Sequence, residues 1–297
     1  GGYFITETLS SGVGLLDYNG DGFLDIYFVN GNKLTEKPSP DIANRLYRNN
    51  GDFTFTDVTA KAGVGDSGFG QGCCAADYDN DGDTDIYVSN FGPNVLYRNN
   101  GDGTFADVTG AAGVADPSWG QSSSFIDYDG DGWLDLYVQN YLTYTLDMNR
   151  EAFIYLGSRK VPDYPSPGNY PGSADHLYRN NHDGTFIDVT KESGILRPQG
   201  KGMGCACVDL NDDGHADIYV ANDGMENFLF RNRGNGTFEE AGLEACASFD
   251  GAGVPEGSMG VDVGDFDRDG RLDLIVPCLR KQSFTLYRNE GEYFTDA

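Results

Sequence analysis

Short apolar segments alternate with polar turns along the chain, and the alternation repeats. In a clear copy, apolar runs over residues 72–76 and 86–90 flank an Asp-rich turn. Two further runs follow at residues 96–99 and 104–109, each after another turn. Segments of this length with imperfect period-two alternation are typical of β-strands that are covered on both faces. Each copy therefore predicts four strands joined by three turns.

Five copies of one polar loop mark this repeat. Each copy has nine residues, with carboxylate or amide side chains at positions 1, 3, 5 and 9 and glycine at position 6. Successive loops start 60, 50, 82 and 56 residues apart, which is the period of a four-stranded propeller blade. We therefore expect an all-β fold, a β-propeller with five repeat units visible. The loops span residues 17–25, 77–85, 127–135, 209–217 and 265–273.

The repeat also predicts how the chain is divided. We expect residues 1–297 to form a single propeller domain, with an insertion at residues 141–174 that accounts for the longest spacing. Its Pro-rich segment, residues 161–167, should not continue a strand and should lie on one propeller face. Residues 1–10 could supply an outer strand that closes a five-bladed ring, or the units belong to a larger ring. The predicted blade units are residues 11–65, 66–115, 116–196, 197–246 and 253–297.

The spacing within the loops is typical of a calcium site. Ca²⁺ takes six to eight oxygen ligands at about 2.3–2.6 Å, and alternate side chains of a tight loop can converge on one ion. Glycine at position 6 permits the turn, and position 7 offers a backbone carbonyl, from Phe23, Asp83, Trp133, His215 and Arg271. The predicted side-chain ligands are Asp17, Asn19, Asp21, Asp25, Asp77, Asp79, Asp81, Asp85, Asp127, Asp129, Asp131, Asp135, Asp209, Asn211, Asp213, Asp217, Asp265, Asp267, Asp269 and Asp273.

Metal-free Asx turns are the alternative explanation of these loops. Three or four carboxylates in one turn would repel one another unless a cation joined them, which favours about five bound Ca²⁺ ions. An EF-hand does not fit, because β-type segments follow the loops and no Glu stands at position 12. Because the loop recurs in every unit, we expect its calcium to be structural. The variable side chain at position 7, such as that of His215, should point away from the metal.

Charge and composition narrow the class of protein. The net charge of -27 excludes affinity for nucleic acid or anionic membranes, yet 39% hydrophobic residues are too many for a disordered acidic chain. No apolar run is long enough to span a membrane, and no signal peptide is recognisable, although Gly1-Gly2 resembles a trimmed end. The six cysteines would fit disulfides in an oxidising compartment or small buried residues. A vicinal disulfide between Cys73 and Cys74 is a further option.

The loop pattern with its following strand resembles the FG-GAP/VCBS repeat of integrin-type propellers. Residues 7–17, 219–232 and 260–265 further resemble the cartilage-acidic-protein-like (ASPIC/UnbV-associated) family. This resemblance implies a secreted or surface-exposed calcium-binding propeller, commonly seven-bladed and often followed by a small C-terminal domain. A periplasmic location is also compatible with it.

No nucleophile, base or cofactor constellation is evident, so we expect a protein that is not an enzyme. Each of His176, His182 and His215 is expected to be a surface or turn residue. The favoured function is a protein–protein interaction or adhesion module. The alternatives are a structural subunit of an extracellular assembly, through self-assembly, and a glycan-binding or accessory module. The insertion's aromatic residues either bind the partner or pack onto the blades: Tyr141, Tyr144, Phe153, Tyr155, Tyr164 and Tyr170.

Overall fold

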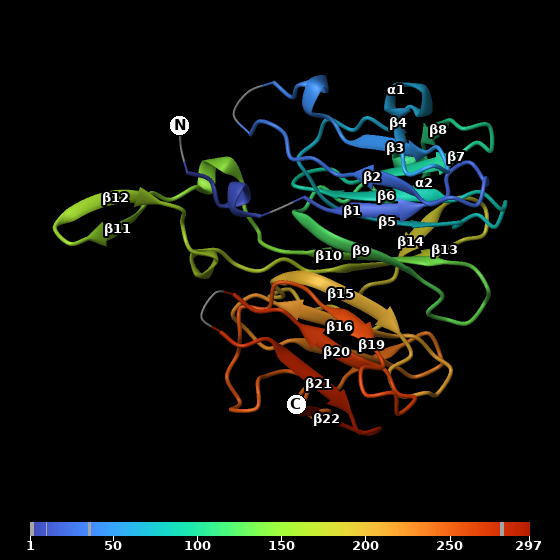
Figure 1. Cartoon of the computed structure of the whole chain (residues 1–297). Coiled ribbons are helices and arrows are strands. Elements are labelled where there is room, and N and C mark those ends of the chain that lie inside the picture. The colour runs from blue at the N-terminus through green and yellow to red at the C-terminus, as the bar shows by residue number, and fades with distance from the viewer. Residues whose placement is uncertain (1–2, 10, 35–36, 280–281) are drawn as a thin grey trace.

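The computed structural model describes residues 3–9, 11–34, 37–279 and 282–297 (Figure 1). It contains five four-stranded antiparallel sheets, one for each repeat unit, and one two-stranded hairpin. These sheets confirm the expected all-β architecture of four-stranded propeller blades. We number them blades 1–5 in chain order.

The first three blades contain the following strands. Blade 1 consists of β1 (Val13–Leu16), β2 (Asp25–Phe28), β3 (Arg45–Asn49) and β4 (Phe55–Asp57). Blade 2 consists of β5 (Gly70–Ala76), β6 (Asp85–Asn90), β7 (Val95–Asn99) and β8 (Phe105–Asp107). Blade 3 consists of β9 (Gly120–Ile126), β10 (Asp135–Asn140), β13 (His176–Asn180) and β14 (Phe186–Asp188).

The remaining elements complete the chain. Blade 4 consists of β15 (Gly202–Val208), β16 (Asp217–Asn222), β17 (Phe228–Asn232) and β18 (Phe238–Glu240). Blade 5 consists of β19 (Asp262–Gly264), β20 (Asp273–Val276), β21 (Thr285–Asn289) and β22 (Phe294–Asp296). The hairpin consists of β11 (Ala152–Leu156) and β12 (Arg159–Asp163). The short helices are η1 (Ile5–Thr8), η2 (Pro40–Ile42), α1 (Thr59–Ala62), α2 (Thr109–Ala112), η3 (Leu146–Met148) and η4 (Pro167–Asn169), and no helix in the described ranges is long and apolar enough to cross a membrane.

The first strands of successive blades pack closely, with β5 against β1 and β9, and β9 against β15 (Figure 1). Glycine is required at these contacts. A Cβ atom on Gly72 would lie 2.7 Å from the carbonyl oxygen of Gln121, and one on Gly204 would lie 2.7 Å from the Cα of Gly260. The glycine-rich first strands therefore reflect the close approach of neighbouring backbones.

The hydrophobic core lies between the blades. Tyr27 and Leu46 of blade 1 pack with Ile86 and Val88 of blade 2, and all four side chains are fully buried. Every residue of β6, β10 and β16 is buried. A strand that is covered on both faces has no need of a polar alternation, which explains the imperfect pattern in the sequence.

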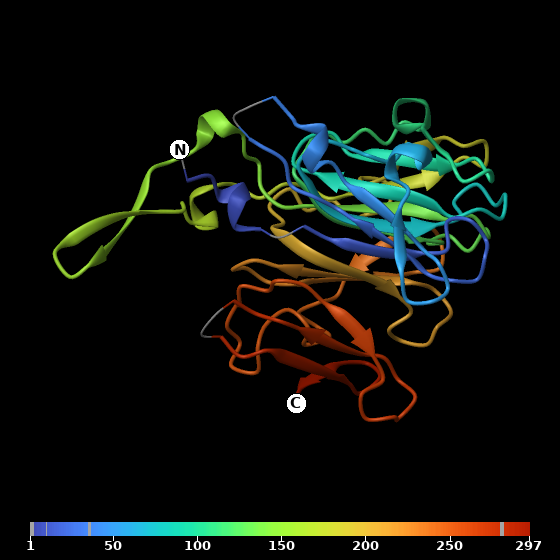
Figure 2. The same cartoon turned by 45° about the horizontal axis from the view of Figure 1, so that its top comes forward.

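The insertion leaves blade 3 at the end of β10 opposite to the Asp-rich loop, and its hairpin projects away from the sheets (Figures 1 and 2). The expectation that the Pro-rich segment contains no strand is wrong for its first part. Val161 and Pro162 lie in β12, where Pro162 pairs in register with Phe153 of β11. A two-stranded hairpin leaves each strand with an open edge, so a residue without an N–H is tolerated there.

The described N-terminal residues do not form the closing strand that one of the two alternatives required. They form η1, whose Ile5 is buried against Trp119 and Met203. The outer strand of blade 5 is its own β22. Leu15 on β1 and Ile275 on β20 remain 61% and 44% exposed, so no blade within the described ranges covers these two faces. Closure into a five-bladed ring is therefore not observed.

The cysteines are not bridged, and four of them lie in the first strands of blades 2 and 4. Cys73 and Cys74 lie in β5, while Cys205 and Cys207 lie in β15. All six cysteines are free thiols, so the disulfide options, including the vicinal bridge, are wrong. Burial raises the pKa of the Cys73 thiol to about 12, which keeps it protonated and unreactive at neutral pH.

Candidate functional site

The five Asp-rich loops connect the first and second strands of the blades, and we number them loops 1–5. The carboxylate at position 9 of each loop accepts two backbone N–H groups. In loop 2, Asp85 Oδ2 accepts from Tyr78 at 3.1 Å and Oδ1 accepts from Asn99 at 2.8 Å. The same pair of hydrogen bonds recurs in the other four loops. All five carboxylates are buried, namely Asp25, Asp85, Asp135, Asp217 and Asp273.

The carboxylates at positions 1 and 5 fix the curl of the loop. In loop 2, Asp77 accepts the N–H groups of Asp81 at 3.1 Å and Gly82 at 2.9 Å, and Asp81 accepts that of Asp83 at 3.0 Å. Equivalent bonds recur in every loop. The bond from position 7 to position 5 closes an Asx turn, so this part of the alternative explanation is present in the structure.

At position 3, three of the five loops bury a side-chain oxygen that accepts no hydrogen bond. Asp79 Oδ1, Asp129 Oδ1 and Asn211 Oδ1 are buried oxygens without a hydrogen-bond partner. Such an atom costs about 1–3 kcal/mol unless a donor or a cation satisfies it. In loops 2 and 3 the position-3 residue lies beside further carboxylates. One oxygen each from positions 1, 3 and 9 lies within 4.8 Å of the others. This oxygen-only donor set fits a hard divalent cation such as Ca²⁺.

The electrostatics of loops 2 and 3 also favour a cation. Burial, followed by the charges of neighbouring aspartates, raises the pKa of Asp79 and of Asp129. Burial raises the pKa of Asp85 and of Asp135 to about 7 in each case, against the backbone N–H bonds that lower it. These loops therefore hold their negative charge at a cost that a bound cation would offset.

Loops 1 and 4 have an amide at position 3. Asn19 Nδ2 donates to Asp21 Oδ2 at 2.9 Å, and Asn211 Nδ2 donates to Asp213 Oδ2 at 2.9 Å. Each amide oxygen therefore remains available to a cation, with one negative charge fewer than in loops 2 and 3. Asn211 Oδ1 is buried, whereas Asn19 is exposed.

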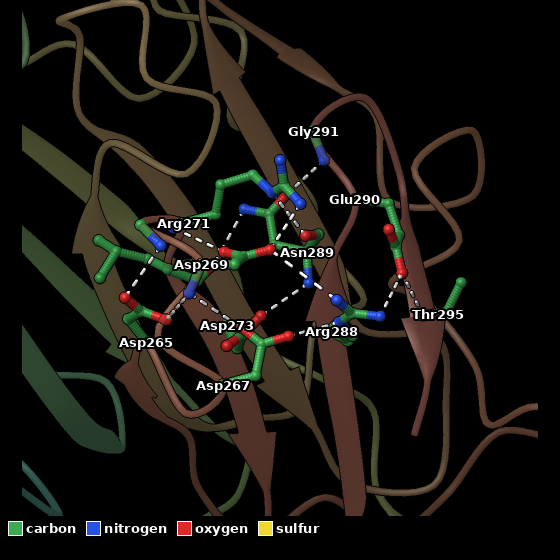
Figure 3. Close-up of polar contacts among 12 residues, drawn as sticks. Asp265, Asp267, Asp269, Arg271, Asp273, Arg288, Asn289, Glu290, Gly291 and Thr295 are labelled. Atoms are coloured by element: carbon green, nitrogen blue, oxygen red, sulfur yellow. Dashed lines mark hydrogen bonds and ion pairs between the residues drawn. The ribbon is translucent and has the colours of Figure 1, made fainter.

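Loop 5 differs from the others because arginines contact its carboxylates (Figure 3). Arg288 Nε donates to Asp267 Oδ2 at 2.7 Å, and Arg271 Nη2 donates to Asp269 Oδ2 at 2.5 Å. The oxygens of Asp265, Asp267 and Asp269 still lie within 4.8 Å of one another. Two guanidinium groups thus already supply positive charge here, so loop 5 suits a divalent cation less well than loops 2 and 3.

The side chains at position 7 lie over the turn between the third and fourth strands. Trp133 stacks on His182 with ring centroids 4.7 Å apart, and His215 covers Gly234 so closely that a Cβ there would lie 2.4 Å from Nε2. For Trp133 and His215 these positions agree with a role of position 7 through its backbone alone. In loop 5 the expectation that this side chain points away is wrong, because Arg271 contacts Asp269 of the same loop. His182 Nε2 also lies 2.7 Å from Asp131 Oδ2, and His176 Nδ1 lies 2.8 Å from Asp188 Oδ2.

A residue outside the loop pattern joins the loops of neighbouring blades. It is the asparagine of the repeated Leu-Tyr-Arg-Asn and Leu-Phe-Arg-Asn segments, whose recurrence in all five units was the available sequence signal. Asn180 Nδ2 donates to the position-8 carbonyl of its own loop, Leu134, at 2.9 Å, and to the Tyr78 carbonyl of the preceding loop at 2.8 Å. The bonds to the preceding loop recur as Asn99 to Tyr18, Asn232 to Tyr128 and Asn289 to Leu210.

The insertion both packs onto the blades and presents an exposed surface. Three of its aromatic residues are buried in a cluster with Trp119, and three are 38% to 69% exposed. On β11, Ile154 and Leu156 are also 43% and 63% exposed. The buried three are Tyr141, Tyr144 and Tyr170, and the exposed three are Phe153, Tyr155 and Tyr164.

A groove of about 970 Å³ lies between η1, the insertion and the loops of blades 4 and 5. Its walls are largely apolar. Two carboxylates, those of Asp163 and Asp223, line it, and the buried Tyr141 hydroxyl donates to Asp223 Oδ2 at 2.6 Å. The other lining residues are Ile5, Thr8, Leu9, Ile154, Tyr164, Pro165, Ser166, Pro167, Met203, Met259 and Leu279.

Sequence comparison supports the interpretation of the repeats. Residues 17–88, 77–138, 166–220 and 209–276 match the model of the FG-GAP-like repeat. A stretch of 91 residues, 30% of this chain, is 37% identical to cartilage acidic protein 1 of Homo sapiens, and 35% identical to that of Mus musculus. The matched stretch spans 13% of the length of these relatives.

Solved structures resemble the chain more distantly. An Agrocybe aegerita lectin that recognises non-reducing terminal N-acetylglucosamine matches with a TM-score of 0.49 and 20% identity, over 97% of this chain and 66% of the lectin. A Bacillus licheniformis rhamnogalacturonan lyase matches with a TM-score of 0.43 and 14% identity, over 95% of this chain and 45% of the lyase. At these scores the likeness supports no inference about ligand or activity.

Proposed function

Because the chain belongs to the FG-GAP-like repeat family, we propose that it is a single calcium-stabilised propeller domain that acts as an extracellular protein-interaction module. The observation that carries this proposal is the exposed apolar strand β11, held out from a rigid set of blades. A surface of this kind, rimmed by polar residues, is typical of protein-binding sites.

Calcium is the proposed structural ligand of the loops. Loops 2 and 3 have the most complete oxygen sets, with ligands from positions 1, 3 and 9 and an unsatisfied oxygen at position 3. Loops 1 and 4 offer one charge fewer, and in loop 5 the arginines would have to move aside. We therefore propose up to five sites with unequal affinity. Bound Ca²⁺ would supply the positive charge that allows several aspartates to face one point.

The partner surface is proposed to comprise the outer face of the hairpin and the adjoining groove. Phe153 and Tyr155 lie on one face of β11, and Lys160 on β12 lies 3.5 Å from the centroid of the Phe153 ring. Aromatic side chains beside a cation are suited to a protein surface that has both apolar and acidic groups.

An extracellular location is supported by two arguments. Calcium sites of low affinity fill where the free ion reaches the millimolar range, outside cells. The relatives detected by sequence are named for cartilage. We further propose that the chain is not an enzyme. Within the described ranges, the rings of His176 and His182 bond to carboxylates and not to a serine, threonine or cysteine side chain, and His215 packs on a turn.

A paired substitution tests the interaction surface. Tyr155→Asn changes an aromatic residue on the hairpin, and Phe53→Asn changes one that is 99% exposed on a turn of blade 1 at the loop end of the sheets. Both variants and the wild type would be applied, with calcium, to an array of secreted and cell-surface proteins and of glycans. We expect at least one protein to bind, with binding at least tenfold weaker for Tyr155→Asn and unchanged for Phe53→Asn. Binding to glycans alone, or equal binding of all three chains, would contradict the proposal.

A further inference from the structure

An asparagine before the third strand fixes the end of the blade opposite to the loops. In blade 2, Asn94 Oδ1 accepts the N–H of Asn90 at 2.8 Å, and its Nδ2 donates to the Tyr87 hydroxyl at 3.1 Å. The Tyr87 hydroxyl in turn donates to the carbonyl of Val114, in the connection to blade 3, at 3.1 Å. Blade 1 has the same three bonds, from Asn44 and Tyr27.

Blade 4 has a similar arrangement of hydrogen bonds. Asn227 Oδ1 accepts the N–H of Asn222 at 2.8 Å, and the Tyr219 hydroxyl donates to the carbonyl of Ala247 at 2.9 Å. In blades 1, 2 and 4 this tyrosine therefore joins its own blade to the connection that leads to the next one.

Blade 3 has an aspartate at the equivalent position. Asp175 Oδ1 accepts the N–H of Asn140 at 2.8 Å, as the asparagines do, but Oδ2 accepts the hydroxyl of Tyr137 at 2.6 Å. The tyrosine hydroxyl thus donates to the carboxylate in place of the connection. In blade 2 the acceptor, Val114, directly follows Gly113. Ile195 follows Gly194 in the same way, so its carbonyl is the one that corresponds to the acceptor in blade 3.

This cluster is buried at the base of the insertion, because Asn140 and Asp175 flank residues 141–174. Asn140 Nδ2 donates to the carbonyl of Ala174 at 2.9 Å and to Asp116 Oδ2 at 2.7 Å. Asp116 and Asp175 are 3% and 6% exposed.

His176 provides the neighbouring cationic group when it is protonated, with Nε2 3.9 Å from Asp116. Its Nδ1 lies 2.8 Å from Asp188 on β14, which is the remaining carboxylate of this group.

We propose that Asp175 is a protonation-dependent switch that couples the base of the insertion to the connection between blades 3 and 4. Uptake of one proton from solvent converts the Asp175 carboxylate to the acid, whose O–H donates to the Tyr137 oxygen. The Tyr137 hydroxyl then donates to the Ile195 carbonyl, as its counterparts do in blades 1, 2 and 4. Loss of the proton to solvent removes the O–H of Asp175, and the Tyr137 hydroxyl then donates to the carboxylate again, as in the arrangement now observed.

The direction of the pH effect follows from burial. Burial raises the pKa of Asp175 to about 7, while the bonds from Tyr137 and Asn140 and the charge of His176 lower it and that of Asp116 raises it. The folded chain therefore holds this proton more tightly than the unfolded chain, where a carboxyl has a pKa near 3.9. The stability that Asp175 contributes is present below about pH 4 and is lost as the pH rises through about 7.

The substitution Asp175→Asn tests this proposal, because asparagine occupies this position in blades 1, 2 and 4. Melting temperatures of the wild type and of this variant would be compared from pH 5 to pH 8 with calcium in excess. The difference in melting temperature between the two proteins cancels the titrating groups that do not interact with Asp175. We expect the melting temperature of the variant to rise relative to that of the wild type as the pH increases, by about 3 °C or more at pH 8. Parallel curves over the whole range would overturn the proposal.

A second readout does not depend on the stability of that variant. In Tyr137→Phe, Asp175 loses the hydroxyl that stabilises its carboxylate, so the pH at which its proton is lost should rise. The carboxyl-carbon NMR signal of Asp175, assigned as the one absent from Asp175→Asn, would report that midpoint directly. We expect a near-neutral midpoint in the wild type and a higher one in Tyr137→Phe. A midpoint near pH 4 in the wild type would overturn the proposal.

Discussion

Asn180 in blade 3 donates a hydrogen bond from Nδ2 to the backbone carbonyl of Tyr78 in blade 2, at 2.8 Å across 102 residues of sequence. Its own N–H group donates to Asp135 Oδ1 at 2.8 Å. Tyr78 is the second residue of loop 2 and Asp135 is the last residue of loop 3, so one side chain connects two proposed metal loops. The geometry of each loop is therefore linked to that of its neighbour.

This link predicts a large loss of stability in Asn180→Ala. The substitution removes the two bonds that Nδ2 donates and the bond that Oδ1 accepts from His182, and it leaves buried carbonyl groups unpaired. We expect the free energy of unfolding to fall by about 3 kcal/mol, measured by urea denaturation.

Asn49→Ala is the matched control, because Asn49 in blade 1 bonds only within its own blade, to Leu24 and Gly51, and is partly exposed. We expect this variant to lose about 1 kcal/mol. Equal losses in the two variants would show that the bond between blades contributes little.

The close approach of the first strands predicts that Gly72→Ala is destabilising. The new methyl group would meet the Gln121 carbonyl at 2.7 Å, and backbone atoms can give way only by moving β5 from β9. We expect a loss of about 2 kcal/mol or more in free energy of unfolding. Gly264→Ala is the control, because no atom outside its chain neighbours lies within 4 Å of its Cβ position. Its expected change is within about 0.5 kcal/mol.

Substitutions at Asp79 test the role of position 3. Asp79→Asn copies loops 1 and 4 and keeps the oxygen, whereas Asp79→Ala removes it. By isothermal titration with CaCl₂, we expect a modest loss of affinity at one site for the asparagine and complete loss of one site for the alanine. Asp147→Ala, on the insertion, removes one charge away from the loops and should leave the number of sites unchanged. Unchanged titration of Asp79→Ala would argue against a metal in loop 2.

The arginines of loop 5 predict a gain of function. Arg288→Gln removes the guanidinium group that contacts Asp267, so the loop should bind Ca²⁺ more tightly. We expect the weakest calcium site of the titration to gain affinity several-fold. Arg231→Gln is the matched control in blade 4, where the arginine donates to the carbonyl of Glu292 and pairs with no carboxylate among the described residues. Equal titrations of wild type and Arg288→Gln would contradict this account.

The repeat made the fold predictable because each blade contains the same loop pattern followed by the same strand segments. The four-stranded sheets, the first strands that carry Cys73 and Cys205, and the place of the insertion all follow from that period. The chain termini were less predictable. No repeat covers residues 3–9, and their apolar Ile5 packs into an aromatic cluster as part of η1 instead of adding a strand.

Spacing predicts that positions 1, 3, 5 and 9 converge, and it treats the five loops as equal. In the structure the grouped oxygens come from positions 1, 3 and 9 in loops 2 and 3, and from positions 1, 3 and 5 in loop 5. Spacing does not show that Arg288 contacts Asp267, because that contact depends on a strand that follows 21 residues later. Nor does the loop spacing show the role of Asp175, which becomes apparent only by comparison with the asparagines at the same place in blades 1, 2 and 4. The division of the insertion's aromatic residues into buried and exposed sets likewise depends on tertiary packing.

Calcium binding by the loops is the central claim, and titration of the metal-free protein tests it most directly. The chain would be treated with EDTA, dialysed into metal-free buffer and titrated with CaCl₂ by calorimetry, with a melting curve recorded at each end point. We expect between three and five bound ions per chain, with those in loops 2 and 3 tightest. The melting temperature should be at least 10 °C higher with calcium, because each filled site adds about RT ln(1 + [L]/Kd) to the free energy of unfolding. Absence of binding heat, together with identical melting curves in EDTA and in calcium, would contradict it.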